Sequence, residues 1–111
     1  MIIASRLLKL RDADADIEIP IRIFLPEKLE NDSWTCRYEI DWPEGKWTLA
    51  AHGVDSIQAI DLALHMIGSE IYTSNYHKAG KLFLEAPGGG YGFPVPKTLR
   101  DLLEGDDAKF Y

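Results

Sequence analysis

Residues 34–72 read WTCRYEIDWPEGKWTLAAHGVDSIQAIDLALHMIGSEIY, and this stretch decides the fold class. In residues 34–42 apolar and polar side chains alternate, which is typical of a β-strand with one buried face. The apolar positions are Trp34, Cys36, Tyr38, Ile40 and Trp42. Residues 17–25 (IEIPIRIFL) show the same period with β-branched side chains. The two stretches therefore predict strands of one sheet.

Residues 43–45 (PEG) predict a turn after the first of these strands, because proline presets φ and glycine accepts a positive φ. The apolar alternation then resumes at Trp47. If Trp42 and Trp47 are to lie side by side on one face, the loop must contain four residues, Pro43 to Lys46, or a bulge. We predict one of these two arrangements.

A helix is predicted from Asp55 to about Tyr72. Asp55 is a suitable N-cap, and Gln58, three residues further on, completes a capping box. Apolar side chains then recur at helical spacing, at Ile57, Ile60, Leu64, Ile67 and Ile71. This stripe matches the apolar face of the sheet in kind and length, so we expect the helix to cover that face.

Two N-terminal features constrain the sheet. Pro20 lacks an amide hydrogen, so the strand at residues 17–25 must lie at an edge or contain a break in its ladder. Residues 2–10 form a strand that is apolar on both faces, and one of its two orientations turns Arg6 inward. The orientation of this strand stays open.

After the helix the pattern is shorter. We expect a strand at residues 81–85, a second at 91–95 returning against it, a helix at 97–104, and a fraying acidic tail at about 105–111. The fold class is therefore α+β: an antiparallel meander of about four to six strands, packed on one face by one long amphipathic helix, with a short C-terminal helix. Residues 1–111 are expected to form a single domain.

The composition excludes some classes of function. Acidic residues outnumber basic ones by 18 to 12, and the formal net charge of −6 opposes binding to nucleic acid. A basic protein partner is not opposed, since opposite charge steers association. Cys36 is the single cysteine, so an intrachain disulfide and a thiolate zinc cluster are excluded. The apolar N-terminal stretch is too short for a membrane span. We expect a cytoplasmic protein that does not bind membranes.

The motifs provide no catalytic site. An EF-hand loop starting at Asp12 would place Ile17 and Ile23 where glycine and glutamate are needed, so a hairpin turn is favoured. The glycines at 88–90 match neither phosphate-binding spacing, and the three histidines, His52, His65 and His77, form no metal motif. We expect no catalytic residue, no metal and no cofactor.

Two groups of residues are candidates for contact. The glycine loop at 88–93 could act with the 76–78 segment as a binding site, through Tyr76, His77, Lys78, Tyr91 and Phe93. Ile3, Leu7 and Phe24 could form an interface on the sheet face opposite the helix. We expect that face to be covered by the C-terminal segment (Phe83, Leu99, Leu102, Leu103) or by a second copy of the chain.

Four segments together carry a resemblance: residues 38–45 (YEIDWPEG), 53–59 (GVDSIQA), 72–78 (YTSNYHK) and 88–96 (GGGYGFPVP). They resemble a family of small bacterial proteins catalogued as a domain of unknown function. The resemblance implies a bacterial cytoplasmic protein of similar size and carries over no catalytic residue. We expect a non-enzymatic protein that acts through protein–protein interaction, with a protein partner or a homodimer. The alternative is a small-molecule-binding protein or enzyme that uses the 88–93 loop with the 76–78 segment.

Overall fold

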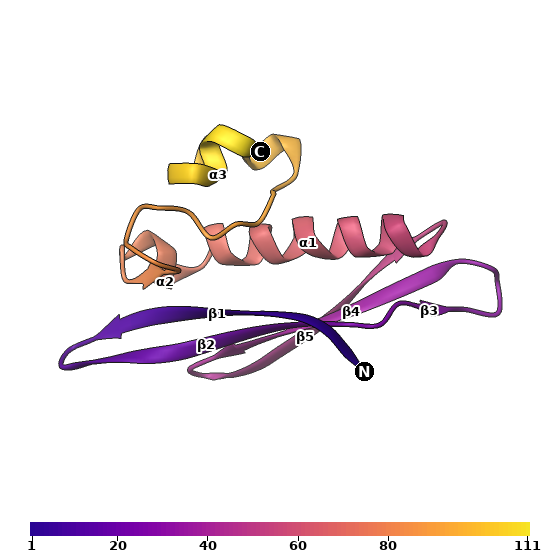
Figure 1. Ribbon diagram of the computed structural model, residues 1–111, viewed down its shortest axis with the longest axis horizontal. Coiled ribbons are helices and arrows are strands. Elements are labelled where there is room, and N and C mark those ends of the chain that lie inside the picture. Colours follow the sequence, from indigo (N-terminus) through magenta and orange to yellow (C-terminus); the bar gives the residue numbers. More distant parts are fainter.

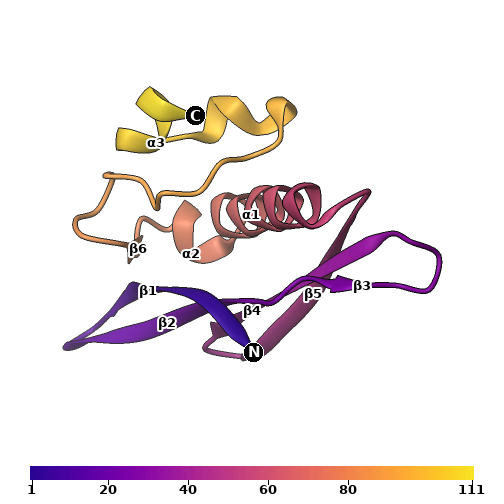
Figure 2. The same ribbon diagram turned by 45° about the vertical axis from the view of Figure 1, so that its right-hand side comes forward.

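A six-stranded antiparallel sheet carries a long helix on one face, which confirms the α+β class. The computed structural model describes all residues, 1–111. The elements are, in chain order, β1 (Ile2–Asp12), β2 (Ala15–Phe24), β3 (Glu27–Lys28), β4 (Trp34–Trp42), β5 (Gly45–Gly53), α1 (Ser56–Tyr72), α2 (Asn75–Lys78), β6 (Leu82–Phe83), the 3₁₀ helix η1 (Lys97–Leu102) and α3 (Gly105–Phe110). In two views, α1 lies between the sheet and the pair η1 and α3 (Figures 1 and 2).

The strands form a meander with two unlike edges. β2 and β3 pair with the same side of β4, while β5 pairs with its other side. β1 lies beyond β2, and β6 pairs with β1. One edge of the sheet is therefore β5, and the other is formed by β1 together with β6, which pairs with Lys9 and Leu10 only. The β4 ladder on β2 stops at Ile21, so Pro20 lies beyond its end, which confirms the predicted break.

The hairpin between β4 and β5 is tighter than predicted. Trp42 pairs with Gly45, and Ile40 pairs with Trp47, so the loop contains only Pro43 and Glu44. The prediction of a four-residue loop or a bulge was wrong because it required Trp42 and Trp47 to be neighbours. In the structure Trp47 lies opposite Ile40 on the helix-facing side. The residues of β5 after Trp47 therefore lie on the faces that the alternation predicts, although their partners in β4 differ.

Helix α1 begins and ends as its sequence predicts. The Asp55 side chain accepts a hydrogen bond from the Gln58 amide at 2.8 Å, and the Gln58 side chain accepts one from the Val54 amide at 2.7 Å. The helix then runs back over the sheet. Gly53 allows this close approach, because a Cβ there would lie 2.6 Å from the Ala59 nitrogen. The buried side chains that face the sheet are Ala59, Ala63, Ile67 and Ile71.

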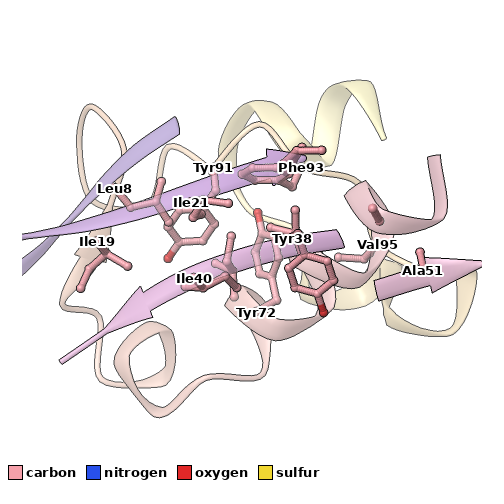
Figure 3. Close-up of a cluster of buried hydrophobic side chains, with 14 of the residues drawn as sticks. Leu8, Ile19, Ile21, Tyr38, Ile40, Ala51, Tyr72, Tyr91, Phe93 and Val95 are labelled. Carbon is pink, nitrogen blue, oxygen red and sulfur yellow. The ribbon is translucent and has the colours of Figure 1, made fainter. Parts of the chain in front are cut away.

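The C-terminal third departs from the predictions. Residues 91–95 form no strand; they run along α1, so closely that a Cβ on Gly68 would lie 1.8 Å from the Pro94 carbonyl oxygen. Residues 105–110, expected to fray, form α3, and Asp107 within it is buried. One core joins all these parts, with sheet residues such as Ile21 and Tyr38 next to Tyr91 and Phe93 (Figure 3).

The orientation of β1 is decided by the inward-facing Arg6. Leu8 and Leu10 are buried on the helix-facing side, and Arg6 shares that side. Its guanidinium donates to the carbonyl of Gly92 at 2.8 Å and to that of Tyr91 at 3.2 Å, and it lies over the Phe93 ring at 4.8 Å. The C-terminal segment thus supplies the acceptors for the inward-facing Arg6 guanidinium. The path of this segment could not be predicted from the sequence.

Candidate functional site

The sheet face opposite α1 is covered by its own charges. Arg22 donates to Asp41 at 2.6 Å and to Glu39 at 3.4 Å, and Lys46 pairs with Glu39 at 3.5 Å. The Asp41 hydrogen bond raises the pKa of Arg22, so the guanidinium stays charged. This network makes most of the face polar, as is usual for a protein surface in contact with solvent.

The predicted interface residues lie on this face beside the network, since Leu7 lines a cavity together with Arg22. Leu7 and Ile3 are about two-fifths exposed, at 41% and 43%. Phe24 is covered by the Arg37 guanidinium, 3.7 Å above its ring. Leu99 and Leu103 pack on the helix side, whereas Phe83 pairs with Lys9 and lies on the same face as Leu7, with the Arg11 guanidinium over its ring. The expected cover by the C-terminal segment is therefore limited to Phe83, and cover by a second copy of the chain stays a prediction.

The C-terminal segment is held by one buried carboxylate. Asp107 is 1% exposed and accepts hydrogen bonds from the Tyr72 hydroxyl and from the amides of Tyr91 and Gly92, both at 2.8 Å. Gly90 lies so close to it that a Cβ would stand 2.8 Å from the Asp107 carboxyl carbon. The glycine loop therefore packs beneath α3. The close packing at Gly90 is possible because glycine has no side chain.

An aromatic triangle adjoins this carboxylate. Tyr72, His77 and Tyr91 meet edge to face, with ring centroids 4.8–5.5 Å apart. The Tyr91 hydroxyl lies 2.5 Å from His77 Nδ1, and His77 Nε2 lies 3.6 Å from Glu104. Burial raises the pKa of Tyr72 and of Tyr91 far above the ordinary value, with the Asp107 hydrogen bond adding to the shift of Tyr72. Both hydroxyls stay protonated and serve as donors.

Access limits what this cluster can do chemically. Neither His77 nor Tyr91 lines the small cavity of about 220 Å³ beside the glycine loop. Its walls are residues 84–86, three glycines, Asp106 and Asp107. Tyr91 is 4% exposed and Phe93 is 3% exposed, and Phe93 lines a separate cavity of about 220 Å³ together with Arg6 and Gly92. The cluster stabilises the course of the C-terminal segment.

The β5 edge of the sheet is open. All nine residues of β5 pair with β4, and no strand pairs with its other side. Proteins usually protect such an edge with proline, a bulge, charge or short length. β5 contains no proline and follows β4 in an unbroken register, and its one Lys or Arg residue is Lys46.

The open edge has a regular backbone pattern. In a two-residue hairpin the closing pair, here Trp42 and Gly45, exchanges both backbone hydrogen bonds, and the pattern then alternates along the strand. Four residues therefore direct their N–H and C=O groups away from β4: Lys46, Thr48, Ala50 and His52. They provide a ready ladder for a further strand.

Apolar side chains form a shelf along the same edge. On the helix-facing side of β5, Trp47 is 44% exposed and Leu49 is 40% exposed. Leu62, Met66 and Glu70 form one stripe of α1 at four-residue spacing, and Glu70 lines a cavity together with Trp47. Leu62 is exposed and Met66 half-buried, so the stripe adds an apolar wall above the edge.

A cavity of about 570 Å³ lies at the Gly45 end of this shelf. Its aromatic walls are Trp42, Trp47 and Tyr76, and its carboxylates are Glu44 and Glu70. The Trp42 and Tyr76 rings stack with centroids 5.3 Å apart and planes 21° apart. The cavity joins the hairpin, the end of α1 and the start of α2, with Thr73, Ser74 and Asn75 completing it.

The charges in this cavity are all negative and unpaired. The Tyr76 hydroxyl donates to Glu44, and this bond raises the pKa of Tyr76. Burial raises the pKa of Glu70. Neither carboxylate forms an ion pair, and no Lys, Arg or His lines the cavity. The site therefore suits a positively charged group with apolar parts.

The five predicted binding residues are dispersed. Tyr76 lines the cavity, Lys78 is exposed, His77 and Tyr91 belong to the buried cluster, and Phe93 lies under Arg6. The residues that sequence reasoning missed are Trp42, Glu44, Trp47 and Glu70. The sequence contained a signal for Trp42 and Trp47. A two-residue loop after Trp42 would have placed Trp47 beside Ile40 on an edge strand.

Comparison with known proteins identifies a family for this chain but does not identify an activity. No helix is long and apolar enough to cross a membrane, and no three His, Cys, Asp or Glu residues group to hold a metal ion. No curated protein and no solved structure matches the chain. A family profile described as a domain of unknown function, DUF6968, matches residues 4–95, which include the sheet, α1 and the cavity but not α3. The resemblance to a domain of unknown function is thus confirmed, and the chain belongs to the DUF6968 family.

Proposed function

We propose that this chain is a non-enzymatic binding module that pairs an extended segment of a partner protein with the open edge of β5. The observation that carries the proposal is the unpaired edge itself, nine residues long and flanked by half-exposed apolar side chains. Strand addition of this kind obtains affinity from main-chain hydrogen bonds and specificity from alternate side chains.

The β5 edge supplies both parts of such recognition. The outward N–H and C=O groups from Lys46 to His52 offer the ladder. Trp47 and Leu49, together with Leu62 of α1, offer apolar contacts for every second side chain of the added segment. Side chains on the other face of that segment would lie beside Thr48 and Ala50.

Charge favours a basic partner over a second copy. The chain carries a net charge of −6, so two copies repel each other while a basic protein is attracted. A bacterial, cytoplasmic setting belongs to the same proposal. The alternative of a small-molecule site at residues 88–93 has less support, because the cavity that Phe93 lines contains none of the other four predicted binding residues.

A selection of random peptides displayed on phage against the purified chain tests the proposal. Enriched peptides should slow amide hydrogen exchange at Lys46, Thr48, Ala50 and His52. Thr48→Pro should abolish their binding, because it removes an outward N–H and places a ring at the edge. Thr48→Val is the matched control; it keeps the N–H group and should bind like the native chain.

The proposal is wrong if no peptide is enriched, or if the enriched peptides bind Thr48→Pro as well as the native chain. Light scattering provides a separate check. A dimer that Thr48→Pro converts to a monomer would assign the edge to a second copy of the chain and would also overturn the proposal.

A further inference from the structure

We infer that the cavity between Trp42, Trp47 and Tyr76 receives a lysine or arginine side chain of the segment bound at β5. The inference rests on the proposed strand pairing for the source of the cation. The preference of the cavity for a cationic side chain follows from its own walls and can be measured without any strand.

The position of the cavity fits a side chain projecting from an added strand. Trp47 belongs both to the apolar shelf and to the cavity wall, so a segment that follows the edge toward Gly45 reaches the cavity directly. Trp47 lies on the helix-facing side, and every second side chain of the segment shares that side. A long, flexible stem can extend from there toward Glu44 and Glu70.

The walls match both parts of such a side chain. The aliphatic stem of lysine or arginine packs well against aromatic rings. Its charged end is attracted to the faces of Trp and Tyr rings, most strongly to Trp. Here the Trp42 and Tyr76 rings are held parallel by stacking, and Trp47 is 44% exposed. The rings are therefore in place before a ligand arrives.

The carboxylates are positioned and free to bind. Glu44 is oriented by the hydrogen bond from Tyr76, and Glu70 projects from the last turns of α1. The basic residue nearest in sequence, Lys46, does not neutralise them; its ammonium group lies on the opposite face, 3.5 Å from Glu39. A half-buried carboxylate without a partner cation, such as Glu70, is poised to gain one from outside.

An NMR titration with Nα-acetyl-L-lysine N-methylamide tests the inference. The indole N–H signals of Trp42 and Trp47 should shift and saturate in the millimolar range. The indole N–H signal of Trp34, at the far end of β4, should not shift and serves as an internal reference. The arginine derivative should behave alike, while the norleucine derivative, of similar shape without charge, should bind at least about tenfold more weakly.

Variants separate the cavity from the general negative charge of the chain. Glu70→Gln should weaken binding of the lysine derivative by about tenfold or more. Asp61→Asn is the matched control, since Asp61 is an exposed carboxylate on the same helix whose partner is His65 at 3.5 Å. It removes the same charge and should leave binding within about twofold.

The two proposals fail in different ways. If the indole signals do not shift, or if norleucine binds as well as lysine, the cation site is wrong, although peptides that protect β5 would leave strand pairing intact. If the lysine derivative binds the native chain and Thr48→Pro alike while no peptide protects β5, strand pairing is wrong and the cation site holds. In peptides that bind, replacing the basic residue with norleucine should cost at least about tenfold.

Discussion

The two edges of the sheet differ in length, in burial and in what covers them. β6 has two residues, Leu82 and Phe83, and both are buried. The chain that follows it is held down by Asp107, and Arg11 lies 4.9 Å above the Phe83 ring. β5 has nine residues, and its apolar Trp47 and Leu49 are about two-fifths exposed.

This difference identifies where the molecule can accept another chain. An unpaired strand edge is a hazard for aggregation, and folded proteins usually close it. At one edge β6 pairs with Lys9 and Leu10 of β1, and Arg6 of β1 bonds to the Tyr91 and Gly92 carbonyls, whereas the nine residues of β5 meet no further strand. The open edge also has the largest described cavity at its end. The contrast therefore favours β5 as the contact region.

The largest expected effect comes from opening the closed edge. Asp107→Ala should lower the free energy of unfolding by about 3–5 kcal/mol, because it leaves the Tyr72 hydroxyl, the buried Tyr91 amide and the half-buried Gly92 amide without an acceptor. Urea denaturation measures the loss. Amide exchange should become faster in β6 and in its partners Lys9 and Leu10, and stay unchanged in β5.

Asp106→Ala is the control for this variant. Asp106 is exposed, and its partner Lys109 lies 3.9 Å away, so the loss should stay below about 0.5 kcal/mol. A similar small loss for Asp107→Ala would mean that the C-terminal segment is not held by the buried carboxylate, and the contrast between the edges would weaken.

A smaller effect tests which backbone groups of β5 point outward. Leu49→Pro removes an N–H that bonds to β4 and should cost about 2–4 kcal/mol. Thr48→Pro removes an outward N–H and should cost less than about 1 kcal/mol. Thermal or urea unfolding of both variants measures the difference, with Leu49→Ala as the control for the lost leucine side chain. Equal losses for the two proline variants would contradict the assigned pattern.

The smallest expected effect is a gain in stability, and it concerns Glu70 in the cavity. Burial raises the pKa of Glu70 above its ordinary value of 4.5, so the folded chain binds the proton more tightly than the unfolded chain. The stability that Glu70 contributes is therefore complete below about pH 4.5 and is lost as the pH rises through the raised pKa. At neutral pH Glu70→Gln should stabilise the chain by less than about 1 kcal/mol, since the side chain is only half-buried.

Unfolding of the native chain and of Glu70→Gln across the acidic range checks this sign. The advantage of the variant should vanish toward low pH. Tyr38 and Tyr76 face the same region, but the pKa of each is raised above its ordinary value of 10, so neither hydroxyl loses its proton in the acidic range. A variant that is less stable at neutral pH would show that Glu70 has a stabilising partner.

Local patterns predicted most of the sheet and the long helix from the sequence alone. The alternation in β2 and β4 depends on which side of a strand each residue occupies, and the Asp55 cap involves residues three apart. The turn at Asp14 between β1 and β2 follows from the same local chemistry. These features need no knowledge of distant parts of the chain.

Tertiary structure alone decided the rest, because it depends on contacts between residues far apart in the sequence. The inward place of Arg6 depends on carbonyls 85 and 86 residues away. The burial of Asp107, in a tail whose composition predicts fraying, depends on donors from Tyr72 and Tyr91. The cavity unites Trp42, Trp47 and Tyr76 from three elements. Such contacts are set by packing and chain course, which periodicity and capping do not encode.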